Sequence, residues 1–134
     1  MREILFRAKD EASHKWVYGY YVHLPSAAGS VHFMHVPAGN PDEHNDAFYI
    51  DPETVGQFTG LTDKNGKKIF EGDILKYYDT MHEVVFCTIN GSAFFGIVMR
   101  DRGEIWAFNY MTTACDAEII GNIHDSPELL EGKE

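Results

Sequence analysis

The segment Gln57–Ile74 constrains the fold of this chain more than any other stretch, because it holds two turn signals in eighteen residues. The first is the run DKNG at 63–66, in which Asn and Gly are residues that tolerate positive φ. The second is the run FEGD at 70–73, after which an apolar run begins. So many specific residue choices in succession predict a fixed local architecture rather than a generic loop.

The specific residues of this segment are interpreted as a structural signature and not as an active site. Glu71 and Asp73 resemble a carboxylate pair for acid–base or metal chemistry, but a turn explains them better. The intervening glycine permits an unusual backbone angle, and Asp73 can accept hydrogen bonds from nearby N–H groups. Apolar residues can anchor the segment, namely Phe58, Leu61, Ile69, Phe70 and Ile74. The residues expected to bend or fix the chain are Gly60, Asn65, Gly66, Gly72 and Asp73.

Short apolar and aromatic runs between turn signals predict a mostly β protein. Roughly eight to ten short strands at intervals of about eight to twelve residues indicate an antiparallel barrel or sandwich. A G-D pair before a strand is also typical of small SH3-like barrels, so an SH3-like pseudobarrel is one form of this prediction. Ser126–Leu130 predicts a short C-terminal helical turn, with Ser as N-cap and Pro at the first position. The expected strands are 4–7, 16–23, 31–36, 48–50, 74–78, 83–89, 93–100, 105–108 and 117–123.

The strand at 16–23 (WVYGYYVH) divides into two alternating sets of side chains. One set, containing Trp16, Tyr18, Tyr20 and Val22, is larger and more uniform, so we expect it to face the core. Gly19, in the other set, predicts a bulge or a close approach of another backbone.

The length of 134 residues predicts one domain spanning 1–134. The loop-like run PAGNPDEHND at 37–46 leaves open a division into two lobes with a soft boundary there. Cys87 and Cys115 form no C-x-x-C pair. The start, MREILFRAKD, lacks a signal-peptide core, and no window approaches a membrane span. We therefore expect a cytoplasmic protein with reduced thiols and no membrane association.

The formal charge of −10 disfavours nucleic-acid binding, because it repels the phosphate backbone. The tyrosines at 18, 20, 21, 77 and 78 suggest a stacking platform for single strands, but such platforms normally lie in basic grooves. Core packing and subunit contacts explain the aromatic residues more simply.

No residue pattern in the chain predicts catalysis, a cofactor or a metal site. His32 and His35 lie three residues apart, and on a strand such residues point to opposite faces. The seven histidines are therefore interpreted as surface residues. Cys115, near Asp116 and His124, has no base placed beside it by the sequence. The patterns G-x-S-x-G, H-E-x-x-H and G-x-G-x-x-G do not occur.

Three stretches resemble the YopX family of phage and prophage proteins: ILFRAKDEASHKWVYGYY, IDPETVGQFTGLTDKNGKKIFEGDILK and EIIGNIHDSPELLEG. The second resembles the family core almost position by position, whereas Lys9 replaces an aromatic residue that the family often has before Asp10. Residues 25–46 match no part of the family pattern. The resemblance implies a β-rich pseudobarrel, a phage or prophage accessory role and no established catalytic activity.

Together these features predict a non-enzymatic, oligomeric module that binds another macromolecule, with a host or phage protein as its partner. The alternative is a nucleic-acid-associated factor with a small-barrel fold. We expect any binding surface at the exposed side of Thr62–Lys68 or at the acidic loop Asp42–Asp46.

Overall fold

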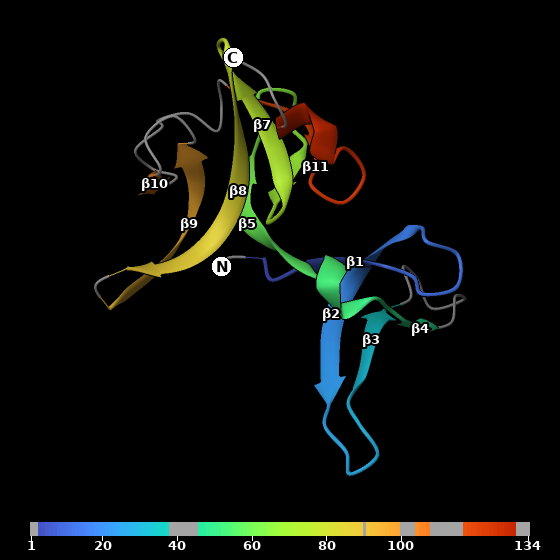
Figure 1. Ribbon diagram of the computed structural model, residues 1–134. Coiled ribbons are helices and arrows are strands. Elements are labelled where there is room, and N and C mark those ends of the chain that lie inside the picture. Colours follow the sequence, from blue (N-terminus) through green and yellow to red (C-terminus); the bar gives the residue numbers. More distant parts are fainter. Residues whose placement is uncertain (1–2, 38–45, 90, 100–103, 108–116, 131–134) are drawn as a thin grey trace. The chain divides into compact units, whose positions relative to one another are not determined.

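A computed structural model describes residues 3–37, 46–89, 91–99, 104–107 and 117–130 (Figure 1). Its elements are strands and two short 3-10 turns, so the prediction of a mostly β, antiparallel protein is confirmed. No helix in these ranges is long and apolar enough to cross a membrane. The elements are β1 (Phe6–Lys9), β2 (Trp16–Leu24), β3 (Val31–Val36), β4 (Asp46–Tyr49), η1 (Pro52–Thr54), β5 (Gly56–Thr62), β6 (Lys68–Phe70), β7 (Asp73–Tyr77), β8 (Thr80–Ile89), β9 (Ser92–Met99), β10 (Glu104–Ala107), β11 (Glu118–Asn122) and η4 (Pro127–Leu130).

The strands form two antiparallel sheets, with the orders β4-β3-β2-β1-β5-β6 and β10-β9-β8-β7-β11. Each order has two ends, so neither sheet closes on itself among the described strands. The chain divides into two compact units between Phe58 and Thr59. This division falls within β5, while most of the soft boundary expected at 37–46 lies outside the described residues. The prediction of a single domain over 1–134 remains untested.

Unit one, residues 1–58, is built on the meander β1–β2–β3–β4. Its centre is formed by Ala8, Met34 and Ile50, each at most 1% exposed. Thr54 ties the η1 turn to strand β1, because its Oγ1 accepts from the Lys9 N–H at 2.8 Å. Asp51 caps η1 by accepting from the Glu53 N–H at 3.0 Å. Partly buried residues complete the core, namely Phe6, Val17, Tyr21, Val36, Phe48 and Val55.

The expected core face of strand β2 is wrong. Val17 and Tyr21 pack on the core, whereas Tyr18 and Tyr20 are 46% and 51% exposed. Gly19 decides the orientation: a Cβ at this position would overlap the main-chain carbonyl oxygen of His35. The close backbone approach expected at Gly19 is therefore confirmed. That approach puts the smaller set of side chains inside and the larger aromatic set outside.

Unit two, residues 59–134, contains the second sheet and the end of β5 with β6. Ile69, Leu75, Val84, Ile97 and Ala117 form its core, with Tyr77, Phe95 and Ile119 packed around them. The long hairpin β8–β9 closes at the predicted turn, where Ile89 pairs with Ser92. Asn90 of that turn lies outside the described residues, and Gly91 has φ 83°. The predicted C-terminal helical turn is confirmed as η4, which begins at Pro127 directly after Ser126.

Candidate functional site

The first turn of the segment Gln57–Ile74 is organised by the buried side chain of Asp63, which is 4% exposed. Its Oδ1 accepts from the backbone N–H groups of Asn65 and Lys67, each at 2.9 Å. Its Oδ2 accepts from the N–H of Ile119 at 3.0 Å, which joins the turn to strand β11. Gly66 has φ 82°, in the region that favours glycine. The turn is therefore held from within by one carboxylate.

The pKa of the Asp63 carboxyl reflects two opposed effects. Burial raises the pKa, because a charged group loses its hydration. The N–H donors of Ile119, Lys67 and Asn65, together with the Lys67 ammonium, favour the anion. These donors outweigh burial, and the pKa lies below its ordinary value of 3.8. Asp63 is therefore a fixed anion that accepts three backbone N–H groups, and such a carboxylate is unsuited to the role of a general base.

The second turn, at 70–73, has the geometry that the sequence predicts. Gly72 has φ 93°, and the Oδ2 of Asp73 accepts from the Phe70 N–H at 2.7 Å. Asp73 is 2% exposed, whereas Glu71 is half-buried, so the two carboxylates lie in different environments. Gly60 also has positive φ, at 92°. Gly60, Gly66 and Gly72 therefore allow the bends of the segment, and Asp73 fixes its second turn.

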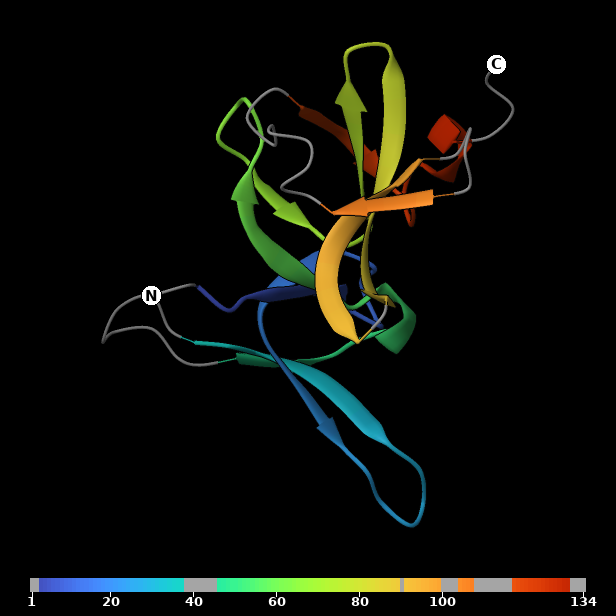
Figure 2. The same cartoon turned by 90° about the vertical axis from the view of Figure 1, so that its left-hand side faces the viewer.

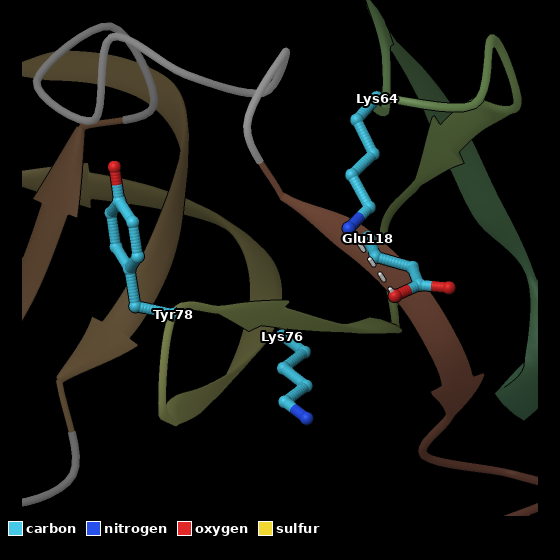
Figure 3. Close-up of a pocket in the computed structure, with 4 residues that line it drawn as sticks. All are labelled: Lys64, Lys76, Tyr78 and Glu118. Atoms are coloured by element: carbon cyan, nitrogen blue, oxygen red, sulfur yellow. Dashed lines mark ion pairs between the residues drawn. The ribbon is translucent and has the colours of Figure 1, made fainter.

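A pocket of about 310 Å³ in unit two is lined by Lys64, Lys76, Tyr78 and Glu118 (Figure 3). The Nζ of Lys64 lies 3.7 Å from the Oε1 of Glu118, and both side chains are about half exposed. Figure 3 shows Tyr78 standing away from this pair. Lys64 belongs to the stretch Thr62–Lys68 that was expected to carry a surface. An ion pair this exposed contributes little to stability.

The described histidines form no cluster with the ligand number of a metal site. Among the described residues, no three side chains of His, Cys, Asp or Glu lie close enough to hold a metal ion. His82 corrects the prediction of surface histidines, because it is 4% exposed. Its Nδ1 lies 3.1 Å from the Val98 carbonyl oxygen and its Nε2 lies 2.7 Å from Thr80 Oγ1. Cys87 is a free, half-buried thiol, while Cys115, Asp116 and residues 42–45 lie outside the described ranges.

The five tyrosines of the suggested stacking platform divide between the two units, three in unit one and two in unit two. Tyr21 packs on the core of unit one, and Tyr77 on the core of unit two. Tyr78, 72% exposed, also belongs to unit two. Tyr77 and Tyr78 touch edge to face, with ring centroids 4.5 Å apart. Within unit one, Tyr18 and Tyr20 share an exposed side because they alternate along β2.

The register of unit one adds Tyr49 to that surface. Tyr20 pairs with His35, and His35 pairs with Ala47, two residues before Tyr49. Residues directly opposite in antiparallel strands share a face, so Tyr49 lies on the same side as Tyr20. Tyr49 is 67% exposed. We call Tyr18, Tyr20 and Tyr49 the tyrosine face.

The charges on this side of the sheet are all positive. Arg7 pairs with Tyr18, and Lys9 pairs with Trp16. The Cζ of Arg7 lies 4.6 Å and the Nζ of Lys9 lies 5.5 Å from the Trp16 ring centroid. The register places no carboxylate on this side within the described parts of β1 to β4. The aromatic side therefore has two cations beside it, a buried arginine and a partly buried lysine, both over the Trp16 ring.

The sequence predicted surfaces at Thr62–Lys68 and Asp42–Asp46, and it missed the tyrosine face. The error follows from the orientation of strand β2, since the aromatic set was assigned to the core. The close approach at Gly19 was the available signal: a glycine marks the side of a strand against which other backbone can pack.

Comparisons with known proteins identify one family and one similar crystal structure. The family model described as YopX protein matches residues 5–131. The crystal structure of protein EF1440 from Enterococcus faecalis is similar, with a TM-score of 0.54 and 27% sequence identity. The match covers 98% of this chain and 100% of that one. No functionally curated protein matches the chain.

Proposed function

The chain belongs to the YopX family, and from this premise we propose that it is a non-enzymatic accessory protein that binds another macromolecule. The observation that carries the proposal is the tyrosine face. Monomeric proteins rarely leave contiguous apolar surface exposed, and such patches mark sites of interaction. Tyrosine is enriched at interfaces because it combines an apolar ring with a hydrogen-bonding tip.

The proposal also covers the partner, the origin and the cellular location of the protein. The partner is a host or phage protein, and the chain itself is oligomeric. An origin in a phage or prophage is supported by the family resemblance. A cytoplasmic location is supported by the free thiol of Cys87. The three N–H groups bound by Asp63 and the contacts at both ring nitrogens of His82 support a non-enzymatic role.

Affinity capture from host and phage-infected lysates tests the role of the tyrosine face. The intact chain is expected to retain a stoichiometric protein partner. The double variant Tyr18→Ala/Tyr20→Ala is expected to lose it, because truncating central aromatic residues typically costs about 2 kcal/mol or more of binding free energy. Retention by quantitative mass spectrometry is the measurement.

Tyr78→Ala is the matched control for this capture, because Tyr78 is an exposed tyrosine of the other unit. It is expected to retain the partner like the natural chain. Equal capture by all three proteins, or no partner from any lysate, would contradict the proposal.

A nucleic-acid role is the second candidate, favoured by Lys9 and the exposed tyrosines on one side of the sheet, where Arg7 is buried. Bases can stack on aromatic residues while cations hold phosphates. A gel shift with single-stranded oligonucleotides at about 50 mM salt separates the candidates, since phosphate contacts are strongest at low salt. The leading proposal expects no shift, and a shift abolished by Tyr18→Ala/Tyr20→Ala would replace it.

A further inference from the structure

Strands β2 and β3 continue beyond their neighbours as a two-stranded arm. Strand β1 pairs with β2 only over Trp16–Gly19, and β4 pairs with β3 only over Phe33–Val36. Beyond these limits His23 pairs with His32, and Leu24 with Val31. We define the arm as residues 22–32; Figures 1 and 2 show it ending in the loop at 25–30.

The arm has little to hold it within the described part of its own unit. Its base is fixed by the Ile50 N–H, which donates to the His32 carbonyl oxygen at 3.2 Å, and by Tyr21 Oη, 2.6 Å from His32 Nδ1. The His23 and His32 rings stack with centroids 4.3 Å apart. Leu24 and Val31 are 52% and 37% exposed. A two-stranded ribbon is marginally stable in water, so a covering surface would stabilise this one.

The arm lies in the longest uncharged part of the chain. Residues 16–41 contain no Asp, Glu, Lys or Arg, although 24% of the whole chain is charged. Two copies of a protein with a net charge of −10 repel each other, and a contact through carboxylate-bearing surface adds local repulsion to that. Repulsion between two such copies is weakest where this neutral segment meets its counterpart.

From these observations we infer that the arm is the contact through which one copy of this chain binds a second copy. The inference rests on the oligomeric part of the proposed function and names its surface. Leu24 and Val31 lie on the same side of the ribbon as Tyr20, by register, so the contact is continuous with the tyrosine face. If the arm of one copy contacts the arm of the other, the same surface is used on both sides, as in the interface of a two-fold symmetric dimer.

The inference fixes the direction of the salt dependence. Added salt screens the repulsion between two acidic copies while leaving apolar contacts in place. Self-association through the arm therefore strengthens as salt rises from about 50 mM to about 500 mM. Association driven by opposite charges, as with a nucleic acid, weakens over the same range.

Sedimentation velocity of the intact protein over a concentration series at both salts is the experiment. The natural chain is expected to exceed its monomer mass of 15.2 kDa, and more so at high salt. Leu24→Glu places a carboxylate at the contact and is expected to raise the dissociation constant by about tenfold or more. Leu61→Glu is the matched control and has the same net charge as Leu24→Glu. Leu61 was expected to anchor its segment, but it is 39% exposed in unit two.

Leu61→Glu is expected to associate like the natural chain. Circular dichroism of Leu24→Glu and Leu61→Glu tests whether both variants fold. Val31→Glu, opposite Leu24, is expected to repeat the effect of Leu24→Glu. If the natural chain associates and Leu24→Glu does so equally, the arm is not the contact, although the oligomer stands. If the natural chain is a monomer at every concentration, the oligomeric part of the proposed function falls with the inference. An association that weakens with salt overturns the charge argument.

Discussion

At the scale of single residues, the carboxylate of Asp63 fixes the backbone of the segment Gln57–Ile74. One carboxylate accepts three backbone N–H groups, two within its own turn and one from strand β11. A side chain with this role cannot be exchanged for another without leaving buried donors unpaired. The specificity of the segment is therefore explained by folding.

Replacing Asp63 is expected to destabilise the protein strongly. Asp63→Ala leaves three donors unpaired and should lower the free energy of unfolding by about 3 kcal/mol. Asp63→Asn keeps one acceptor oxygen and should cost less. Urea unfolding at about pH 7 measures both variants. A loss below about 0.5 kcal/mol for Asp63→Ala, typical of a surface substitution, would contradict the account.

The same carboxylate predicts a pH dependence. Its pKa is lowered in the folded protein, so its contribution to stability is complete above its unfolded pKa of about 3.9 and is lost as the pH falls through the folded pKa. The difference in unfolding free energy between the natural chain and Asp63→Ala should therefore be constant above about pH 5 and shrink below about pH 4. Urea titrations across this range measure it. A difference that grows on acidification would have the wrong sign.

At the scale of elements, the strand pattern was predictable and the sidedness of one strand was not. Strand β3 has its predicted bounds, and most other strands lie within a few residues of theirs. Two strands of the signature segment were not predicted, β5 at Gly56–Thr62 and β6 at Lys68–Phe70. Both lie beside its turn signals, which led us to interpret the segment as turns. The aromatic residues of β2 were assigned to the core because size favours burial, whereas the backbone approach at Gly19 decided otherwise.

Gly19 is therefore expected to tolerate no side chain. Gly19→Ala drives a Cβ into the His35 carbonyl and the neighbouring Val36 backbone, and should cost about 1–3 kcal/mol of stability. The urea midpoint of unfolding measures the loss. Tyr20→Ala, at the next and exposed position, is the control and should change the midpoint little. A Gly19→Ala protein as stable as the natural chain would show that the two strands can separate at no cost.

The candidate site was less predictable than the fold because it depends on the orientation and pairing of strands that lie far apart in the sequence. The turn residues Gly66, Gly72 and Asp73 carry local signals that a sequence shows directly. The tyrosine face depends on the orientation of β2 and on the register of β2, β3 and β4, which bring Tyr49 beside residues far earlier in the chain. Local patterns do not specify such long-range pairing.

At the scale of the whole molecule, the two units differ in what they expose. Unit one presents an aromatic side with positive charges and an uncharged arm, within a chain that is strongly acidic. Unit two holds residues 59–74 of the signature segment. The carboxylates of Asp63 and Asp73 in this part are buried and accept hydrogen bonds from backbone N–H groups. We therefore propose that unit one recognises partners and that the turn geometry of the signature segment serves folding.

Hydrogen–deuterium exchange of the protein alone and in complex with its captured partner tests this assignment most directly. The account predicts that partner binding slows exchange in peptides covering strands β2 and β3, residues 16–36, and leaves the signature segment 57–74 unchanged. Slower exchange confined to residues 57–74, around Thr62–Lys68, would contradict it and return the binding surface to the signature turn.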